Sequence, residues 1–232
     1  MINAKSDFNF IILNIKAYIK FKIICLVSFI FRGHIIRNKK IKNYLNSHRI
    51  RKLHLGSTFE MKGFLNSQIM GDVPIDITKR LPFDDNTIDL IYSSHLIEHI
   101  HRREIINFLK DSYRVLRLGG KHIISTPSLT NVVNICYGKK EYERKILYEH
   151  AKTFYDDDFF STAHQLNLLM RGFGHRFILD YNFIKEAGKK IGYKNIIILR
   201  KRNFGDKIIS HYIKKRKPER WSLETETFSL TK

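Results

Sequence analysis

Apolar segments separated by short polar stretches run through the chain from residue 42 onward. Most of these segments are short, rich in β-branched and aromatic residues and bounded by turn-forming residues, a pattern typical of buried strands. We predict seven strands, at Arg51–Leu55, Phe64–Ile69, Val73–Ile77, Thr87–Ser93, Lys121–Thr126, Asn195–Arg200 and Trp221–Phe228.

Helical spacing of apolar positions lies between two of these strands. Arg103–Leu116 carries apolar side chains three or four residues apart, and the glycine pair Gly119-Gly120 predicts the end of that helix. A shorter helix is expected at Ile41–Ser47. Strands that alternate with helices predict an α/β fold with a doubly wound, mostly parallel, seven-stranded sheet. Ligands of such a sheet bind at the carboxyl ends of the strands.

The first forty residues have a different pattern. Phe8–Phe31 is mostly apolar, but lysines interrupt it and leave Ile23–Phe31 as the longest uncharged run. That run is far shorter than the ~20 residues needed to span a bilayer. The polar residues share one narrow face of a helical wheel. We therefore divide the chain into a basic amphipathic helical extension, residues 1–40, and an α/β domain, residues 41–232.

The positive charge is concentrated outside the central part of the chain. The formal net charge is +20, and residues 1–52 hold 12 Lys and Arg against a single acid. A basic amphipathic helix either lies on an anionic membrane surface or covers the sheet of its own domain, and both interpretations stay open. Basic ends also attract nucleic acid, but no aromatic and basic stacking motif accompanies them, so a nucleic-acid partner is not favoured.

The two cysteines bear on the cellular compartment of the protein. Cys25 and Cys136 lie in apolar segments, without the spacing of a metal site or a disulfide framework. A secretory signal fits poorly, because lysines fall inside the apolar region and no small-residue cleavage site follows. We therefore expect a cytoplasmic protein that contacts the inner face of the membrane peripherally through residues 1–40.

Several short motifs occur in order between residues 52 and 127. They are Leu53-His54-Leu55-Gly56-Ser57, Asp76-Ile77-Thr78, Leu81-Pro82-Phe83-Asp84-Asp85-Asn86, Ile88-Asp89-Leu90-Ile91-Tyr92-Ser93-Ser94-His95, Glu98-His99 and Arg114-Val115-Leu116-Arg117-Leu118-Gly119-Gly120. Together they resemble the class I S-adenosylmethionine-dependent methyltransferases, in particular the methyltransferase type 11 group. Ordered motifs at family spacing are far more specific than a lone glycine pattern.

The resemblance implies S-adenosylmethionine as the cofactor. Gly56 would let the backbone turn tightly and approach the methionyl part of the cofactor, as a residue with a side chain could not. Asp76 is implied to accept a hydrogen bond from the adenine amine, whereas a turn-capping role would be purely structural. The predicted cofactor-binding residues are Gly56, Ser57, Gln68, Asp76, Ile77 and Ser94.

His95 and His99 are the predicted catalytic residues. They lie four positions apart, on one face of a short helix with Glu98 beside them, and either imidazole can take a proton from a hydroxyl or amine near neutral pH. A hydrogen-bonded pair that anchors the helix is the alternative role for Glu98 and His99. His101 extends the group, but no further ligand of convincing spacing lies nearby, so no metal is predicted. His175 is expected either to border the acceptor pocket or to be a satisfied loop histidine.

Two positions depart from the family pattern. Thr58 stands where a second glycine of the loop is usual, and Gln68 stands where an acid normally holds both ribose hydroxyls. A β-branched residue would crowd the cofactor if that backbone needs a positive φ. An amide also lacks the charge-assisted, bidentate grip of a carboxylate.

The sequence therefore predicts an S-adenosylmethionine-dependent methyltransferase that acts on a carbohydrate or a lipid-linked glycan precursor in polysaccharide biosynthesis. The substrate follows from the resemblance alone, because the type 11 group is common among bacterial cell-surface carbohydrate genes. Two alternatives stay open. One is an RNA methyltransferase that holds phosphates with its basic ends, and the other is a catalytically silent, methyltransferase-like binding protein, which Thr58 and Gln68 favour.

Overall fold

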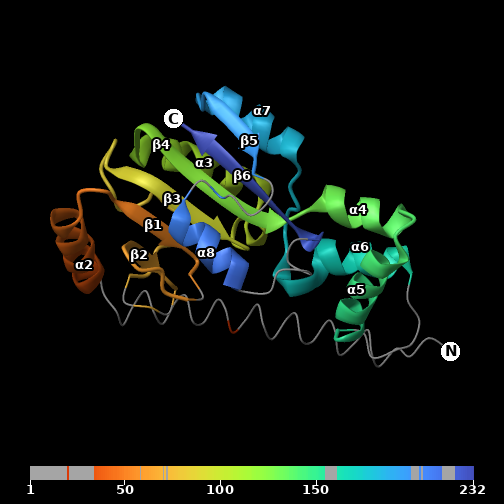
Figure 1. The fold of residues 1–232 in the computed structure, drawn as a ribbon. Coiled ribbons are helices and arrows are strands. Elements are labelled where there is room, and N and C mark those ends of the chain that lie inside the picture. The colour runs from red at the N-terminus through yellow and green to blue at the C-terminus, as the bar shows by residue number, and fades with distance from the viewer. Residues whose placement is uncertain are drawn as a thin grey trace.

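A six-stranded sheet forms the centre of the described part of the chain (Figure 1). The computed structural model describes residues 20, 34–57, 59–69, 71, 73–154, 161–199, 204, 206–215 and 223–232. Most of the predicted extension and the departure at Thr58 lie outside these residues. The strands are β1 (Lys52–Leu55), β2 (Phe64–Ser67), β3 (Ile88–Ser94), β4 (Leu116–Pro127), β5 (Asn195–Ile198) and β6 (Thr225–Thr231).

The strand order is β2-β1-β3-β4-β6-β5. β1 pairs in parallel with β2 and β3, and β3 pairs in parallel with β4, whereas β6 runs antiparallel to its neighbours β4 and β5. Every strand except β6 therefore points the same way, which confirms the predicted mostly parallel α/β sheet. Leu55 lies opposite Ser93 and Ser94 opposite Ser125, so the chain leaves β1 and β3 at the same edge of the sheet.

One predicted strand is wrong, so the described residues form six strands instead of seven. Residues 73–77 form an extended loop with a turn at its end. Val73, Ile75 and Ile77 are nevertheless buried in the main core, so their alternation reflects a loop packed against the domain. Pro74 between them has no N–H to donate to a neighbouring strand, which disfavours pairing in a sheet.

The glycine pair Gly119-Gly120 lies inside β4, not in a turn before the strand as predicted. The helix ends at Val115, and β4 begins at the next residue. Ile88 pairs with Leu116 but Leu90 pairs with Lys121, so the glycines occupy a bulge between these two pairs. Gly119 has a φ of +78°, a conformation that favours glycine and that a bulge often requires.

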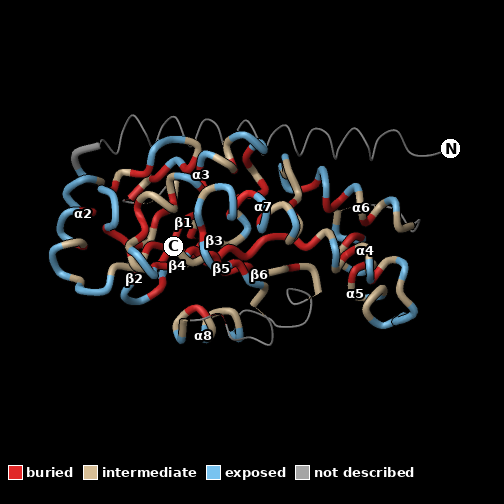
Figure 2. The backbone as a smooth tube through the Cα atoms, turned by 90° about the horizontal axis from the view of Figure 1, so that it is seen from above, coloured by how far each residue is buried: buried red, intermediate tan, exposed pale blue. Residues whose placement is uncertain are grey.

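Helices cover both faces of the sheet, which confirms the doubly wound arrangement. Figure 2 shows α3 and α7 on one side of the strands and α8 on the other. The helices are α2 (His34–Ser47), α3 (Arg102–Val115), α4 (Leu129–Tyr137), α5 (Glu141–Lys152), α6 (Thr162–Arg171), α7 (Tyr181–Ile191) and α8 (Lys207–Lys215), with short 3-10 turns η1 (Ile97–His99) and η2 (Gly172–Gly174).

The two faces of the sheet have separate cores, because successive side chains of a strand point to opposite sides. In β3, Ile91 belongs to the main core under α3 and α7, whereas Leu90 and Tyr92 face α8. In β4, Ile124 belongs to the main core, and Ile123 belongs to the core under α8. Burying both faces keeps the sheet rigid, and a rigid sheet fixes the positions of the residues that follow its strands.

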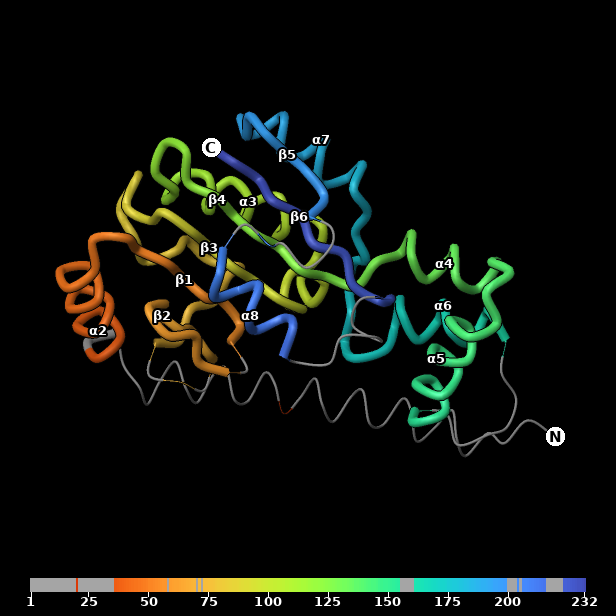
Figure 3. Tube along the Cα trace, viewed as in Figure 1, coloured from red at the N-terminus to blue at the C-terminus, as the bar shows by residue number. Residues whose placement is uncertain are grey.

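A small helical group extends beyond the carboxyl end of β4 (Figures 1 and 3). β4 leads into α4 through Ser128, whose Oγ accepts a hydrogen bond from the backbone N–H of Asn131 and so caps the helix. α4, α5 and α6 share a third apolar cluster that includes Val132, Leu147 and Leu169. This group forms a wall over the edge of the sheet at which β3 ends.

Helix α2 crosses the boundary that was predicted at residue 40. Ile41 and Tyr44 are buried in the main core, and the Tyr44 hydroxyl lies 2.8 Å from the carbonyl oxygen of Lys52 at the start of β1. The second half of α2 is thus part of the α/β domain, and the division of the chain into two parts stays a prediction. None of the helices in the described ranges is long and apolar enough to cross a membrane.

Candidate active site

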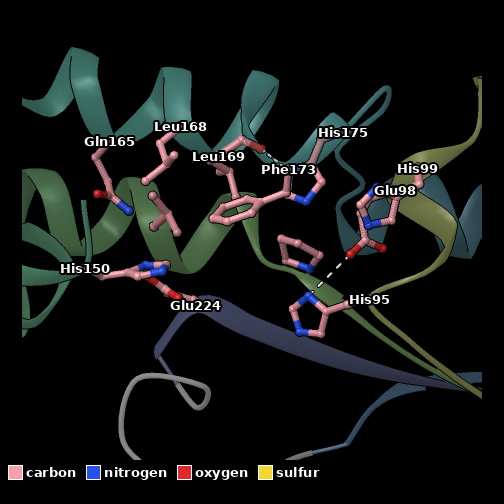
Figure 4. A pocket seen from close by; sticks show the side chains of 12 residues that line it. His95, Glu98, His99, His150, Gln165, Leu168, Leu169, Phe173, His175 and Glu224 are labelled. Atoms are coloured by element: carbon pink, nitrogen blue, oxygen red, sulfur yellow. Dashed lines mark hydrogen bonds and ion pairs between the residues drawn. The ribbon is translucent and has the colours of Figure 1, made fainter. Parts of the chain in front are cut away.

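A cavity of about 310 Å³ lies between the carboxyl edge of the sheet and the α4–α6 group (Figure 4). One side comes from η1 and the segment before it, and the other comes from α4, α5, α6 and η2. Its lining residues are His95, Glu98, His99, Pro127, Val132, His150, Gln165, Leu168, Leu169, Phe173, His175 and Glu224.

His95 is placed by the end of β3. Its backbone N–H donates to the carbonyl oxygen of Ser125 at 2.9 Å, which fixes it to β4. The ring lies between two partners, with Nδ1 3.3 Å from Glu98 Oε1 and Nε2 3.1 Å from Thr225 Oγ1. His95 precedes the 3-10 turn that contains His99, so the two histidines do not share a helical face as predicted, but both line the cavity.

Glu98 is the most buried polar residue of the cavity. Its side chain is fully buried, and Thr126 donates a hydrogen bond to its Oε2 at 3.2 Å. Burial alone would raise the pKa of this carboxyl, but the interaction with His95 and the charges of His95 and His99 lower it below the usual value. Glu98 is therefore a buried carboxylate at neutral pH, suited to orient His95 and to stabilise its protonated form.

His175 enters the cavity from the loop after η2. Its Nδ1 lies 2.6 Å from the carbonyl oxygen of Leu169, so Nδ1 carries the proton and Nε2 keeps a lone pair. Burial lowers the pKa of His175, because it disfavours the charged ring. The sequence left open whether this residue borders the pocket, and the structure places it there, in edge-to-face contact with His99 at 5.1 Å between ring centroids.

The other end of the cavity holds a second pair of histidine and carboxylate. His150 Nδ1 lies 2.8 Å from Glu224 Oε1. Gln165 is 3 % exposed, and within the described part of the chain its Oε1 has no hydrogen-bond partner. A buried amide oxygen without a partner is costly, so this group is suited to meet a donor on a ligand. Local spacing offered no signal for these residues.

Two lining residues have strained backbones. His95 has a φ of 48° and Phe173 a φ of 56°, the left-handed region that residues with a side chain rarely adopt. Such strain persists only where surrounding contacts over-determine the conformation, and it clusters at functional sites. The two strained residues lie on opposite walls of the same cavity.

The predicted glycine turn follows β1 at the same edge. Gly56 has a φ of +65°, and a Cβ at this position would lie 2.9 Å from Cδ1 of Leu96, the residue after His95. The positive φ favours glycine here, and a side chain would also displace the end of Leu96. Ser57 is 3 % exposed, and its Oγ has no hydrogen-bond partner among the residues that the structure describes. A buried hydroxyl without a partner, next to a tight glycine turn, fits a polar cofactor at this place.

The other predicted cofactor residues lie outside the cavity lining. Ser94 is the last residue of β3, and Gln68 follows β2 directly, so both stand at carboxyl ends of strands. Asp76 is exposed, and its Oδ1 accepts hydrogen bonds from the Thr78 backbone N–H at 2.9 Å and hydroxyl at 2.7 Å. Ile77 is buried in the main core. Asp76 thus caps a turn, and its role toward adenine stays a prediction.

Comparison with known proteins identifies the domain. Residues 60–124 match the model of a methyltransferase domain family, which confirms the class inferred from the motifs. The matched residues include β2, β3 and α3 and run into β4, and the S-adenosylmethionine cofactor is what this similarity implies.

Two solved structures are similar to this chain over most of its length. One is an S-adenosylmethionine-dependent methyltransferase from Archaeoglobus fulgidus, with 14% identity, a TM-score of 0.46, and coverage of 89% of this chain and 98% of that one. The other is phosphoethanolamine N-methyltransferase 2 from Haemonchus contortus, with 14% identity, a TM-score of 0.40, and coverage of 84% and 52%. Comparison with curated proteins gives no match.

Proposed function

We propose that this protein transfers a methyl group from S-adenosylmethionine to a hydroxyl or amine of a carbohydrate or lipid-linked glycan precursor. The observation that carries the proposal is His95, held in a strained conformation between Glu98 and Thr225 where β3 opens into the cavity. A base fixed at this edge stands where ligands of parallel sheets bind. The membrane surface and polysaccharide biosynthesis are the proposed setting.

Two regions of this edge would have separate roles. The ends of β1 and β2 would bind the cofactor, and the end of β3 would act on the acceptor. Bound S-adenosylmethionine would supply an electrophilic methyl group on a sulfonium. Gly56 and Ser57 would admit and hold the cofactor at the end of β1, and Gln68 would donate to or accept from one ribose hydroxyl at the end of β2. Alignment of donor and acceptor is the main source of rate in such a displacement.

Proton removal falls to His95. His95 would accept, at Nε2, the proton that the acceptor hydroxyl or amine loses when it is methylated, because Nδ1 is the nitrogen that faces Glu98. The Glu98 carboxylate stabilises the imidazolium that forms, because its charge is buried and lies 3.3 Å away.

The cavity chemistry favours a polyhydroxylated acceptor. The amide of Gln165 and the His150–Glu224 pair offer hydrogen-bonding groups at one end, and the ring of Phe173 offers a flat apolar surface. Sugar rings combine hydroxyl groups with apolar C–H faces, and this pocket matches both features.

A methyl-transfer assay with labelled S-adenosylmethionine tests the proposal. Wild-type protein should label a glycan or lipid-linked sugar from a panel that also holds RNA and phosphoethanolamine. His95→Asn should reduce the rate by about 100-fold or more, because asparagine tolerates the left-handed backbone but cannot act as the base. His101→Asn, a change outside the cavity lining, is the matched control. Labelling of RNA alone would overturn the glycan assignment.

A catalytically silent binding protein is the second candidate. Gln68 in place of an acid, and the turn-capping contacts of Asp76, favour it because both weaken the expected grip on the cofactor. Such a protein would give no labelled product with any acceptor.

A further inference from the structure

Three side chains with metal-ligating atoms converge at one end of the cavity, where Figure 4 shows them side by side. They are Glu98 and His99 from η1 and His175 from the loop after η2. One ligand atom from each, a carboxylate oxygen and two ring nitrogens, lie within 4.8 Å of one another. Proximity alone does not define a metal site. The side chains must also be in the protonation state that binds a metal, and the backbone must hold them together.

His175 is presented in the form that binds metals. Its Nδ1–H donates to the Leu169 carbonyl oxygen at 2.6 Å, which leaves Nε2 with a free lone pair. Metal-binding histidines commonly donate their other N–H to a backbone carbonyl, because this bond fixes the tautomer and the ring orientation.

Glu98 supplies a buried negative charge. Its side chain is fully buried, and in the described ranges Oε1 has no hydrogen-bond partner; His95 Nδ1 approaches it at 3.3 Å without hydrogen-bond geometry. A buried carboxylate with an unsatisfied oxygen is costly unless a cation or donor completes it. A bound cation would share this carboxylate with His95, whose Nδ1 lies 3.3 Å from Oε1.

The backbone holds the third ligand beside the first two. The N–H groups of Arg176 and Phe177 both donate to the carbonyl oxygen of Glu98, at 2.8 and 3.2 Å. These bonds join residues that are almost eighty positions apart in the chain. The backbone therefore holds His175 beside η1.

We propose that Glu98, His99 and His175 bind one divalent transition-metal ion, and that Zn²⁺ is the best match. Two imidazole nitrogens and one carboxylate oxygen form a donor set that suits zinc and leaves a fourth position for water or substrate. Zinc–nitrogen bonds of about 2.0–2.1 Å place tetrahedral ligands about 3.3 Å apart, so the side chains must close in by up to about 1.5 Å.

The open fourth position would face the cavity. An acceptor oxygen bound there would be polarised by the ion and would lose its proton more easily. This use of the ion rests on the proposed function, but metal binding itself can be measured without any methyl transfer.

The test uses the full-length chain without an affinity tag, stripped with a chelator. Calorimetry with Zn²⁺ should give one tight site per chain, and Co²⁺ should give the visible absorption of a four-coordinate site. His99→Asn and Glu98→Gln should each weaken Zn²⁺ binding by about 10-fold or more and remove the Co²⁺ bands. Circular dichroism identifies any variant that fails to fold.

Two histidines provide matched controls. His101→Asn lies two residues from His99, and His150→Asn lies in the same cavity but outside the cluster, so both should bind Zn²⁺ as wild type does. Absence of a tight Zn²⁺ site in wild type, or equal binding by wild type and a folded His99→Asn variant, would overturn the proposal. Binding of S-adenosylmethionine is measured separately from binding of Zn²⁺. Failure of the metal proposal can therefore be distinguished from failure of the proposed function.

Discussion

His150 Nδ1 lies 2.8 Å from Glu224 Oε1, although 74 residues separate the two in the chain. α5 carries the histidine, and the segment that enters β6 carries the glutamate. The contact closes the end of the cavity opposite His95 (Figure 4).

The first prediction concerns this pair. Glu224→Gln should raise the KM for the acceptor about 10-fold and leave kcat nearly unchanged, because the pair lies at the end of the cavity opposite His95 and would contribute to acceptor binding alone. Steady-state kinetics with varied acceptor measure both constants. Glu149→Gln, an exposed neighbour of His150, should change neither. A fall in kcat with an unchanged KM would show that the pair belongs to the catalytic step.

Arg114 ties the loop of residues 81–85 to α3. Its guanidinium donates to the carbonyl oxygens of Leu81 and Phe83, at 3.1 and 2.8 Å, and pairs with Asp85 and Asp111. Arg114→Met should lower the free energy of unfolding by about 2–4 kcal/mol, because the two carbonyl oxygens and the mostly buried Asp111 lose their donor. Urea unfolding measures the change.

Arg117→Met is the matched control for that change. Arg117 pairs with Asp89, but both side chains are about a third exposed, so the loss should stay below about 1 kcal/mol. Equal losses for the two variants would contradict the anchoring role of Arg114.

We expect the buried His122 to make the folded protein less stable at acidic pH. Burial lowers its pKa to about 3 from the model-peptide value of 6.5, so the unfolded chain binds a proton between these pH values and the folded chain does not. Stability should therefore rise with pH across this window, with His122 contributing about 1.4 kcal/mol per pH unit. His122→Leu should flatten the pH dependence of the urea midpoint between pH 4 and 6.5, within the window set by these values.

His211→Leu provides the comparison for the pH experiment, because His211 is exposed on α8. This variant should keep the wild-type slope. An unchanged slope in His122→Leu would mean that the acid sensitivity comes from other groups.

The basic extension predicts binding to anionic membranes. Full-length protein should sediment with vesicles that contain phosphatidylglycerol, and a variant without residues 1–33, which keeps α2 whole, should not. Lys16→Glu with Lys20→Glu should weaken sedimentation in the full-length chain, since the attraction is partly electrostatic. Equal sedimentation of the truncated and full-length proteins would exclude a membrane role for the extension.

The strands that carry the site could be predicted from the sequence, because β1, β3 and most of β4 are apolar runs bounded by polar turns. The end of β3 at Ser94 placed His95 correctly at the carboxyl edge. The segment around Pro74 could not be assigned by alternation alone, since a buried loop and a buried strand give the same pattern.

The far wall of the cavity could not be predicted. Gln165, His150 and Glu224 meet only because α4–α6 pack beyond the sheet, and no periodicity encodes that packing. His99 and His175 lie side by side because two backbone hydrogen bonds join the segment after His175 to Glu98, and local sequence does not encode these bonds. The positive φ of His95 is likewise a product of tertiary contacts.

Calorimetric titration with S-adenosylmethionine and S-adenosylhomocysteine tests the central claim most directly. Wild type should bind each at a single site, and Asp76→Ala should weaken binding by about 1–3 kcal/mol, whereas Asp84→Ala, an exposed carboxylate of the next turn, should not. Thr58→Gly with Gln68→Asp should strengthen binding, because the changes relieve crowding and add a charged ribose acceptor. If neither the folded wild type nor this double variant binds S-adenosylmethionine or S-adenosylhomocysteine, the chain is not an S-adenosylmethionine-dependent enzyme.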